Sequence, residues 1–133
     1  MYASLDRKGF ARGETIEVHV FIDNDTTAKV TPRVSLHQIQ IFMCGTRHKT
    51  IDLPVTGEDD TKAEEEIRGQ EVEPKSKSEQ TLKVYVQDRD ALSIKSSLIS
   101  VKYFVHVTLD IPFCADMKID LPVVLTKQNV IGL

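Results

Sequence analysis

The amino-acid sequence predicts an all-β fold, in which two antiparallel sheets pack face to face as a sandwich of the immunoglobulin type. Two observations support this prediction. Apolar and polar residues alternate in several segments that turn residues separate, and no segment shows a convincing helical period. In addition, residues 97–111 keep a strict alternation over their whole length, which is longer than a typical strand of about five or six residues.

Residues 97–111 are predicted to form the central strand of one sheet. Their apolar side chains recur at every second position, and a period of two places them all on one face of a strand. These residues are Ile99, Val101, Tyr103, Val105, Val107, Leu109 and Ile111. The other face is mostly polar, with Phe104 as the exception. We therefore expect the apolar face to lie in the core.

The N-terminal part is expected to form strands over residues 2–8 and 15–23. Gly9 and Gly13 lie between them and suit a turn that needs a positive φ. Residues 24–27 read Asn-Asp-Thr-Thr, which is turn chemistry because short Asn and Asp side chains bond their own backbone.

Residues 30–44 are expected to form a second long strand. The phase of its apolar side chains slips near Gln38, which predicts a β-bulge or a strand that passes between the sheets. Residues 47–53 are polar and are expected to form a poorly buried edge partner of this strand.

The remaining segments complete the predicted sandwich. Residues 56–66 are strongly acidic and are expected to form a solvated loop; the spacing of an EF-hand is absent, so no calcium site is predicted. Short strands are expected over residues 67–73 and 80–87, followed by a loop over residues 88–95. The last strand is expected over residues 117–125.

Composition excludes several classes of function. The 133 residues fit one domain, and a net charge of −3 with no basic stripe argues against a nucleic-acid partner. No run of apolar residues is long enough to span a membrane, and the charged N-terminus predicts no secretory signal. Cys44 and Cys114 could join the two sheets as a disulfide, but two reduced, buried thiols in a cytosolic protein are the preferred interpretation.

No catalytic or metal-binding motif is present in the sequence. The four histidines, at positions 19, 37, 48 and 106, have no metal-ligand spacing. A nucleophile elbow, a phosphate-binding glycine loop and a dinucleotide fingerprint are also missing. We therefore expect a binding or scaffold module without enzyme activity, metal or cofactor. Phe21 and Phe104 lie on the polar faces of their strands and are candidate partner contacts; the alternative is that they cover another domain or pack under a loop.

Two segments resemble a known family. The first contains Leu5, Asp6, Arg7, Gly9, Phe10, Gly13, Glu14, Ile16, Val18, Asn24 and Thr26. This segment resembles the opening of the C-terminal arrestin domain. The second spans residues 101–112 and 120–123 and is similar to the closing strands of the α-arrestins, also called arrestin domain-containing proteins. The resemblance implies an arrestin C-terminal domain over residues 1–127 and the start of a tail at residues 128–133.

The resemblance also implies a function. Family members are adaptors that hold cytoplasmic tails of receptors or transporters and, in α-arrestins, recruit HECT-type ubiquitin ligases for ubiquitination and endocytosis. Recruitment uses PPxY motifs in a tail, and this chain has no two adjacent prolines. The implied partners include an N-terminal arrestin domain, and the implied location is cytoplasmic, peripherally at the plasma membrane and endosomes. A purely structural half, which stabilises the N-terminal domain and carries the ligase-recruiting tail, is the alternative.

Thioredoxin is not an expected partner. One member of the family bonds thioredoxin through a cysteine just before the strand that corresponds to residues 97–111. Ser96 stands at that position, and a hydroxyl cannot form a mixed disulfide.

Overall fold

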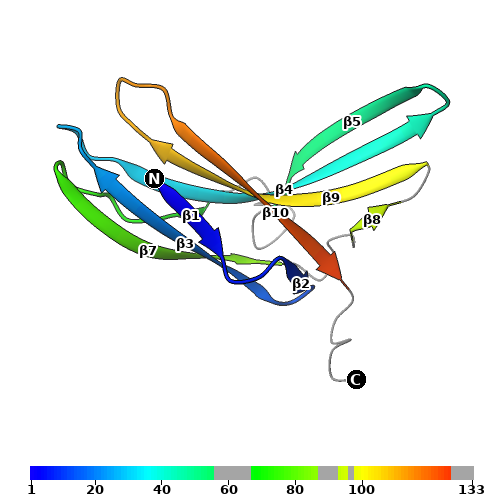
Figure 1. Ribbon diagram of the computed structural model, residues 1–133, viewed down its shortest axis with the longest axis horizontal. Helices are drawn as coiled ribbons and strands as arrows, with labels where there is room; N and C mark the ends of the chain where they lie inside the picture. Colours follow the sequence, from blue (N-terminus) through cyan, green and yellow to red (C-terminus); the bar gives the residue numbers. More distant parts are fainter. Residues whose placement is uncertain (56–66, 87–92, 96–97, 127–133) are drawn as a thin grey trace.

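A computed structural model describes residues 1–55, 67–86, 93–95 and 98–126. Over these residues the chain forms strands and no helix, and the strands make two sheets that pack against each other (Figure 1). The predicted β-sandwich is therefore confirmed. No helix of the described part has the length and apolar character needed to cross a membrane. The expected acidic loop at 56–66, most of the loop at 88–95, Ser96 and the expected tail lie outside the described residues.

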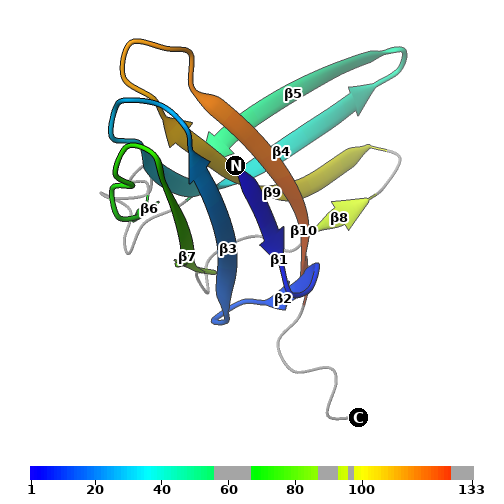
Figure 2. The same cartoon turned by 60° about the vertical axis from the view of Figure 1, so that its left-hand side comes forward.

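The smaller sheet consists of three antiparallel strands, which Figure 2 shows side by side. They are β1 (Tyr2–Leu5), β3 (Thr15–Asn24) and β7 (Ser76–Tyr85), in the order β1-β3-β7. β3 pairs with β7 over its full length. β7 begins four residues before the expected strand at 80–87, because its first residues still pair with the end of β3.

The larger sheet contains seven strands around β9. Its main path runs β2 (Gly9–Ala11), β10 (Met117–Thr126), β9 (Ile99–Asp110), β4 (Thr31–Cys44) and β5 (Arg47–Pro54). Two short strands lie off this path: β6 (Ile67–Arg68) pairs with β4, and β8 (Ile94–Lys95) pairs with β9. As predicted, β9 is a central strand and β5 lies at the edge of the described sheet.

One edge of the larger sheet joins an early and a late part of the chain. β2 runs parallel to the end of β10, with Phe10 opposite Leu125. The amide of Val124 also donates to the carbonyl of Lys8 at 2.8 Å. All other strand pairs in the described residues are antiparallel.

The core lies between the sheets and is aliphatic. The alternating face of β9 contributes Val101, Tyr103, Val105, Val107 and Leu109, all of them buried. Ile99 and Ile111 at the two ends of the predicted face are only partly buried. Burying an aliphatic or aromatic side chain of this size contributes about 1.5–3 kcal/mol. The predicted organising role of this segment is therefore confirmed.

The bulge or sheet crossing predicted near Gln38 is wrong. β4 stays in register with β9 from Thr31 opposite Asp110 to Phe42 opposite Ile99, without an inserted residue. The distal half of β4 instead extends past the smaller sheet together with β5 and β9 (Figure 1). Among the described residues no second sheet covers this half, so its inner face does not have to be apolar.

Polar side chains occupy the inner face of β4 where its phase changes. Gln38 is buried, and its Nε2 donates to the hydroxyl of Tyr103 at 2.6 Å. The Oε1 of Gln38 accepts a hydrogen bond from Nε2 of Gln40 at 2.5 Å. The buried amide of Gln38 is therefore satisfied by hydrogen bonds. The alternation of the strand places Ile39 and Ile41 on the outer face.

The expected burial of the two cysteines is also wrong. Cys44 and Cys114 are both free and exposed. Cys44 ends β4 at the tip of the β4–β5 hairpin, and Cys114 lies in the turn between β9 and β10. Both turns lie beyond the packed part of the sandwich, so neither thiol reaches the core.

The turns agree with the sequence at two positions and differ at one. Gly13 has a φ of +87° as expected, whereas Gly9 lies in β2 and needs no positive φ. Asn24 is buried, and its Oδ1 accepts the amide of Thr26 at 3.1 Å. Its Nδ2 donates to three backbone carbonyls, among them that of Val72 at 3.1 Å. Asn24 thereby joins the turn to the segment that precedes β7.

A charged corner connects β2 and β3. The carboxylate of Glu14 accepts a hydrogen bond from the amide of Ala11 at 2.7 Å and one from the guanidinium of Arg7. That guanidinium also lies 4.7 Å from the ring centroid of Phe10. The amide of Ala11, and then Arg7, hold the pKa of Glu14 below its ordinary value.

Gly69 lies where a side chain does not fit. A Cβ at this position would meet Oε1 of Gln80 at 2.4 Å and Cγ of Pro32 at 2.8 Å. Gln80 cannot move away without loss, because its side chain accepts the amide of Gln70 at 2.8 Å and donates to the carbonyl of Gln70 at 2.9 Å. Glycine is therefore required for the contact between β7 and this segment.

We expect Gly69→Ala to lower the free energy of unfolding by about 1–3 kcal/mol, the usual cost of overpacking. Urea denaturation followed by circular dichroism measures the change. Gly9→Ala is the matched control, because a Cβ at Gly9 has no atom within 4 Å. Equal stability of the Gly69→Ala variant and the unaltered chain would contradict this account.

We expect the stability of the Glu14→Gln variant to fall less steeply with decreasing pH than that of the unaltered chain. A carboxyl group whose pKa is lower in the folded state contributes stability above its unfolded pKa, and this stability is lost as pH falls through the folded pKa. The unaltered chain should therefore lose more stability than the variant below about pH 4.5, as measured by thermal unfolding at a series of pH values. Parallel curves for the two proteins would rule out a role for Glu14.

Candidate partner-binding surfaces

Phe21 lies on the outer face of the smaller sheet. The inner residues of β3 are buried and its outer ones exposed, so the alternation turns Phe21 away from the core, with 38% of its surface exposed. Its cross-strand neighbours are Tyr2 on β1, which is 75% exposed, and Glu79 on β7. Two aromatic rings thus lie next to each other on a solvated face.

A hollow of about 450 Å³ lies over this part of the sheet. It is lined by Tyr2, Ser4, His19, Val20, Phe21, Glu79, Gln80 and Thr81. The lining combines aromatic rings with hydrogen-bonding side chains from all three strands. Such a surface suits an extended peptide that offers one apolar side chain and several polar groups.

Phe104 lies on the outer face of the larger sheet, where it is partly buried. Its ring stacks on the imidazole of His37 from β4, with ring centroids 5.0 Å apart and planes inclined by 19°. The imidazole of His106 meets that of His37 edge-on at 5.2 Å. Phe104 therefore belongs to a cluster of three rings.

Carboxylates hold two of these rings in place. Nδ1 of His37 lies 2.9 Å from Oδ1 of Asp52 on β5, and Nδ1 of His106 lies 2.5 Å from Oδ1 of Asp120 on β10. Both histidines lie on the outer faces of their strands. Both side chains are only about a quarter exposed, because Phe104 and the aspartates cover them.

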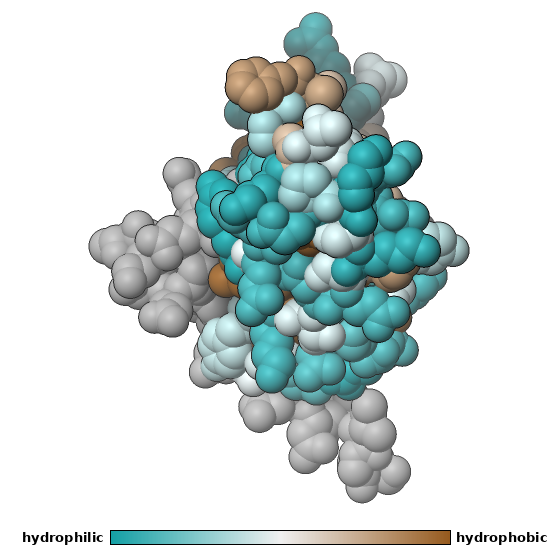
Figure 3. Space-filling view, turned by 90° about the vertical axis from the view of Figure 1, so that its left-hand side faces the viewer, coloured by the Kyte–Doolittle hydropathy of each residue, from teal (hydrophilic) through white to brown (hydrophobic). Residues whose placement is uncertain are grey.

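The structure does not bring the two candidate aromatics together. Phe21 is on the outside of the smaller sheet and Phe104 on the outside of the larger one, so the sandwich separates them. Seen end-on, the molecule is largely hydrophilic, with apolar side chains gathered at one end (Figure 3). A third aromatic, Phe113 in the turn between β9 and β10, is fully exposed and was not singled out from the sequence.

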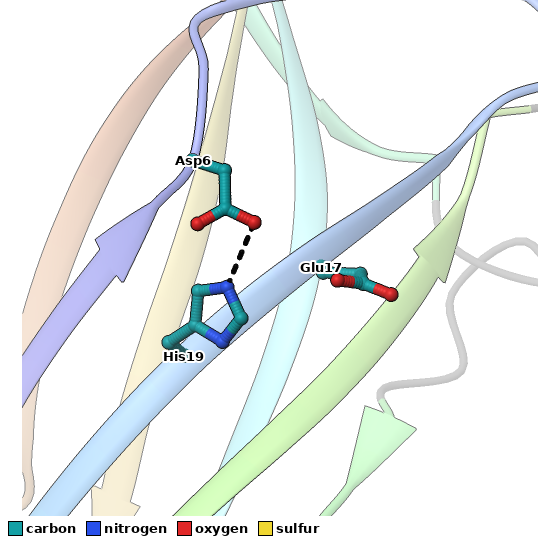
Figure 4. Close-up of side chains that lie close together, drawn as sticks. All are labelled: Asp6, Glu17 and His19. Carbon is teal, nitrogen blue, oxygen red and sulfur yellow. Dashed lines mark hydrogen bonds and ion pairs between the residues drawn. The ribbon is translucent and has the colours of Figure 1, made fainter.

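A second group that sequence reasoning missed lies beside the hollow (Figure 4). Asp6, Glu17 and His19 each offer one ligand atom, and these atoms lie within 4.8 Å of one another. Nε2 of His19 lies 3.0 Å from Oδ2 of Asp6, and its Nδ1 lies 3.1 Å from Oγ1 of Thr81. The Glu-x-His spacing places two of the three on one face of β3, but only the pairing of β1 with β3 brings Asp6 to them.

Residues 1–130 match the family described as Arrestin (or S-antigen), C-terminal domain. A human relative, Arrestin domain-containing protein 4, is 25% identical over 126 residues, which cover 92% of this chain and 28% of the relative. The chain thus spans less than a third of the length of this relative.

Proposed function

This chain belongs to the arrestin family as a C-terminal domain, and on that premise we propose that it is an adaptor domain for membrane cargo. Members of the family are non-enzymatic adaptors that act through protein–protein contacts. The proposed cargo is a cytoplasmic segment of a receptor or transporter. The proposed outcome is its delivery to ubiquitination and endocytosis machinery, in the cytoplasm at the plasma membrane and endosomes.

The observation that carries this proposal is the hollow over Phe21. Two neighbouring aromatic side chains, Phe21 and Tyr2, lie on a mostly polar face, and a hollow above them spans three strands. Aromatic side chains at the centre of a contact supply much of the binding energy in protein interfaces. An extended cargo segment lying over the hollow would cover both rings and bond to the polar groups around them.

The outer face of the larger sheet offers a second contact. Phe104 packs against two histidines, so little side-chain entropy is lost when a partner covers it. The free edge of β5 adds a row of backbone groups, since β5 pairs only with β4 in the described residues. Unpaired strand edges accept peptide strands.

Ligase recruitment needs chain beyond these residues. The family's PPxY motif requires two adjacent prolines, which this sequence lacks. We therefore assign cargo holding to this domain and ligase recruitment, through a HECT-type enzyme, to a tail in the full-length protein.

The adaptor role predicts that Phe21→Ser and Phe104→Ser in the full-length protein weaken cargo binding. Each loss is expected to be about tenfold, because truncating an aromatic anchor costs on the order of 1–2 kcal/mol. Binding to immobilised cytoplasmic tails of receptors and transporters measures it. Tyr85→Ser is the matched control, because Tyr85 is exposed on the same sheet but does not line the hollow.

The same variants test the structural alternative. If Phe21 and Phe104 only cover an N-terminal arrestin domain, their replacement would weaken association of the two domains and leave cargo binding intact. That result would assign the domain a purely structural role.

A further inference from the structure

We propose that Asp6, Glu17 and His19 form a binding site for a divalent transition metal, with Zn²⁺ as the reference ion. The proposal does not rest on the adaptor role, although His19 also lines the hollow over Phe21. It would join the loop after β1 to the middle of β3 on the outer face of the smaller sheet.

The backbone already brings the three donors together. Glu17 and His19 are two residues apart on β3 and share its outer face, and the pairing of Leu5 with Val18 delivers Asp6 to the same place. Zinc–ligand bonds of about 2.0–2.2 Å place neighbouring ligand atoms about 3–4 Å apart. The observed separations of at most 4.8 Å are therefore closed by rotating exposed side chains. Glu17 has to turn toward the pair in Figure 4.

The set of donors selects the class of ion. An imidazole nitrogen with two carboxylates suits Zn²⁺ and its neighbours in the first transition row, whereas Ca²⁺ and Mg²⁺ prefer oxygen alone. His19 thus distinguishes this group from a cluster of acidic residues.

The imidazole of His19 can offer a ring nitrogen to a cation in this group. Nε2 of His19 lies 3.0 Å from Oδ2 of Asp6, and in the Nε2–H tautomer it donates a hydrogen bond to that carboxylate. When the Nδ1–H of His19 donates to Thr81 Oγ1, 3.1 Å away, Nε2 presents its lone pair to the site. An outer hydrogen bond of this kind orients metal-ligating histidines in general. A metal ion would then replace the proton that the pair shares.

Glu17 is available as the third ligand. It has no hydrogen bond or ion pair among the described residues. A competing cation is Lys83, the cross-strand neighbour of Glu17 on β7. Lys83 should therefore weaken metal binding. Replacing this lysine with a neutral residue should strengthen binding, whereas replacing a ligand should weaken it.

The larger sheet supplies internal controls. His37 with Asp52 and His106 with Asp120 are also histidine–aspartate pairs, but neither belongs to a group of three possible ligands in the described residues. A site that needs three donors should distinguish them from His19.

The experiment titrates ZnCl₂ into the EDTA-treated, dialysed protein by calorimetry in a non-chelating buffer near pH 7. We expect saturation at one ion per chain with a Kd of roughly micromolar. His19→Ala, His19→Asn and Glu17→Gln should each weaken binding more than about tenfold, and Thr81→Val about tenfold. Lys83→Met should strengthen it. His106→Ala, and a double Cys44→Ser, Cys114→Ser variant that lacks the exposed thiols, should leave it unchanged.

Thermal unfolding of each variant in EDTA shows whether the variant still folds. If His19→Ala does not fold, His19→Asn replaces it, because asparagine keeps hydrogen-bonding atoms at this position. Saturable binding that depends on His19 and Glu17 supports the site. Absence of saturable binding, or an equal loss in His106→Ala or in the cysteine double variant, overturns it.

Discussion

The pairing of β9 with β4 and β10 is the constraint on which the rest of the structure depends. β9 pairs with β4 over twelve residue positions and presents an unbroken apolar face to the smaller sheet. Because side chains alternate at every residue, a slip of one position would move that whole face into solvent. The register of β9 therefore fixes which residues of its neighbours are inside and which remain outside for partners.

Those parts of the fold that depend on local alternation could be predicted from the sequence. β3, β9 and β10 each carry their own pattern, and the structure confirms them. The change of phase in β4 is present in the sequence, but the bulge or sheet crossing predicted from it is wrong, because the cause of the change is not local. The alternation of apolar residues in β4 changes where the opposing sheet ends. The sequence of β4 alone does not show how far that other sheet extends. The exposure of Cys44 at the tip of that same hairpin has the same origin.

The candidate site shows a similar division. Phe21 and Phe104 are predicted on the outer faces from their position in the alternation, and both are found there. Tyr2 as a neighbour of Phe21, the histidines around Phe104, and the approach of Asp6 to His19 all depend on cross-strand register. Strand register is set by the turns and by the shared core. A single sequence therefore contains the residues of these clusters but does not show that the folded chain brings them into contact.

The parallel pairing of β2 with β10 has a consequence for synthesis of the protein. Phe10 finds its partner at Leu125, so the first and last parts of the sandwich are joined late, after the intervening residues have been made. A nascent chain that stops short of β10 leaves residues 103–109 of β9 unpaired on one side and part of the apolar core open to water. Contacts between residues this distant in sequence make folding slow. An incomplete chain on the ribosome would expose unpaired strand edges, which bind chaperones or aggregate.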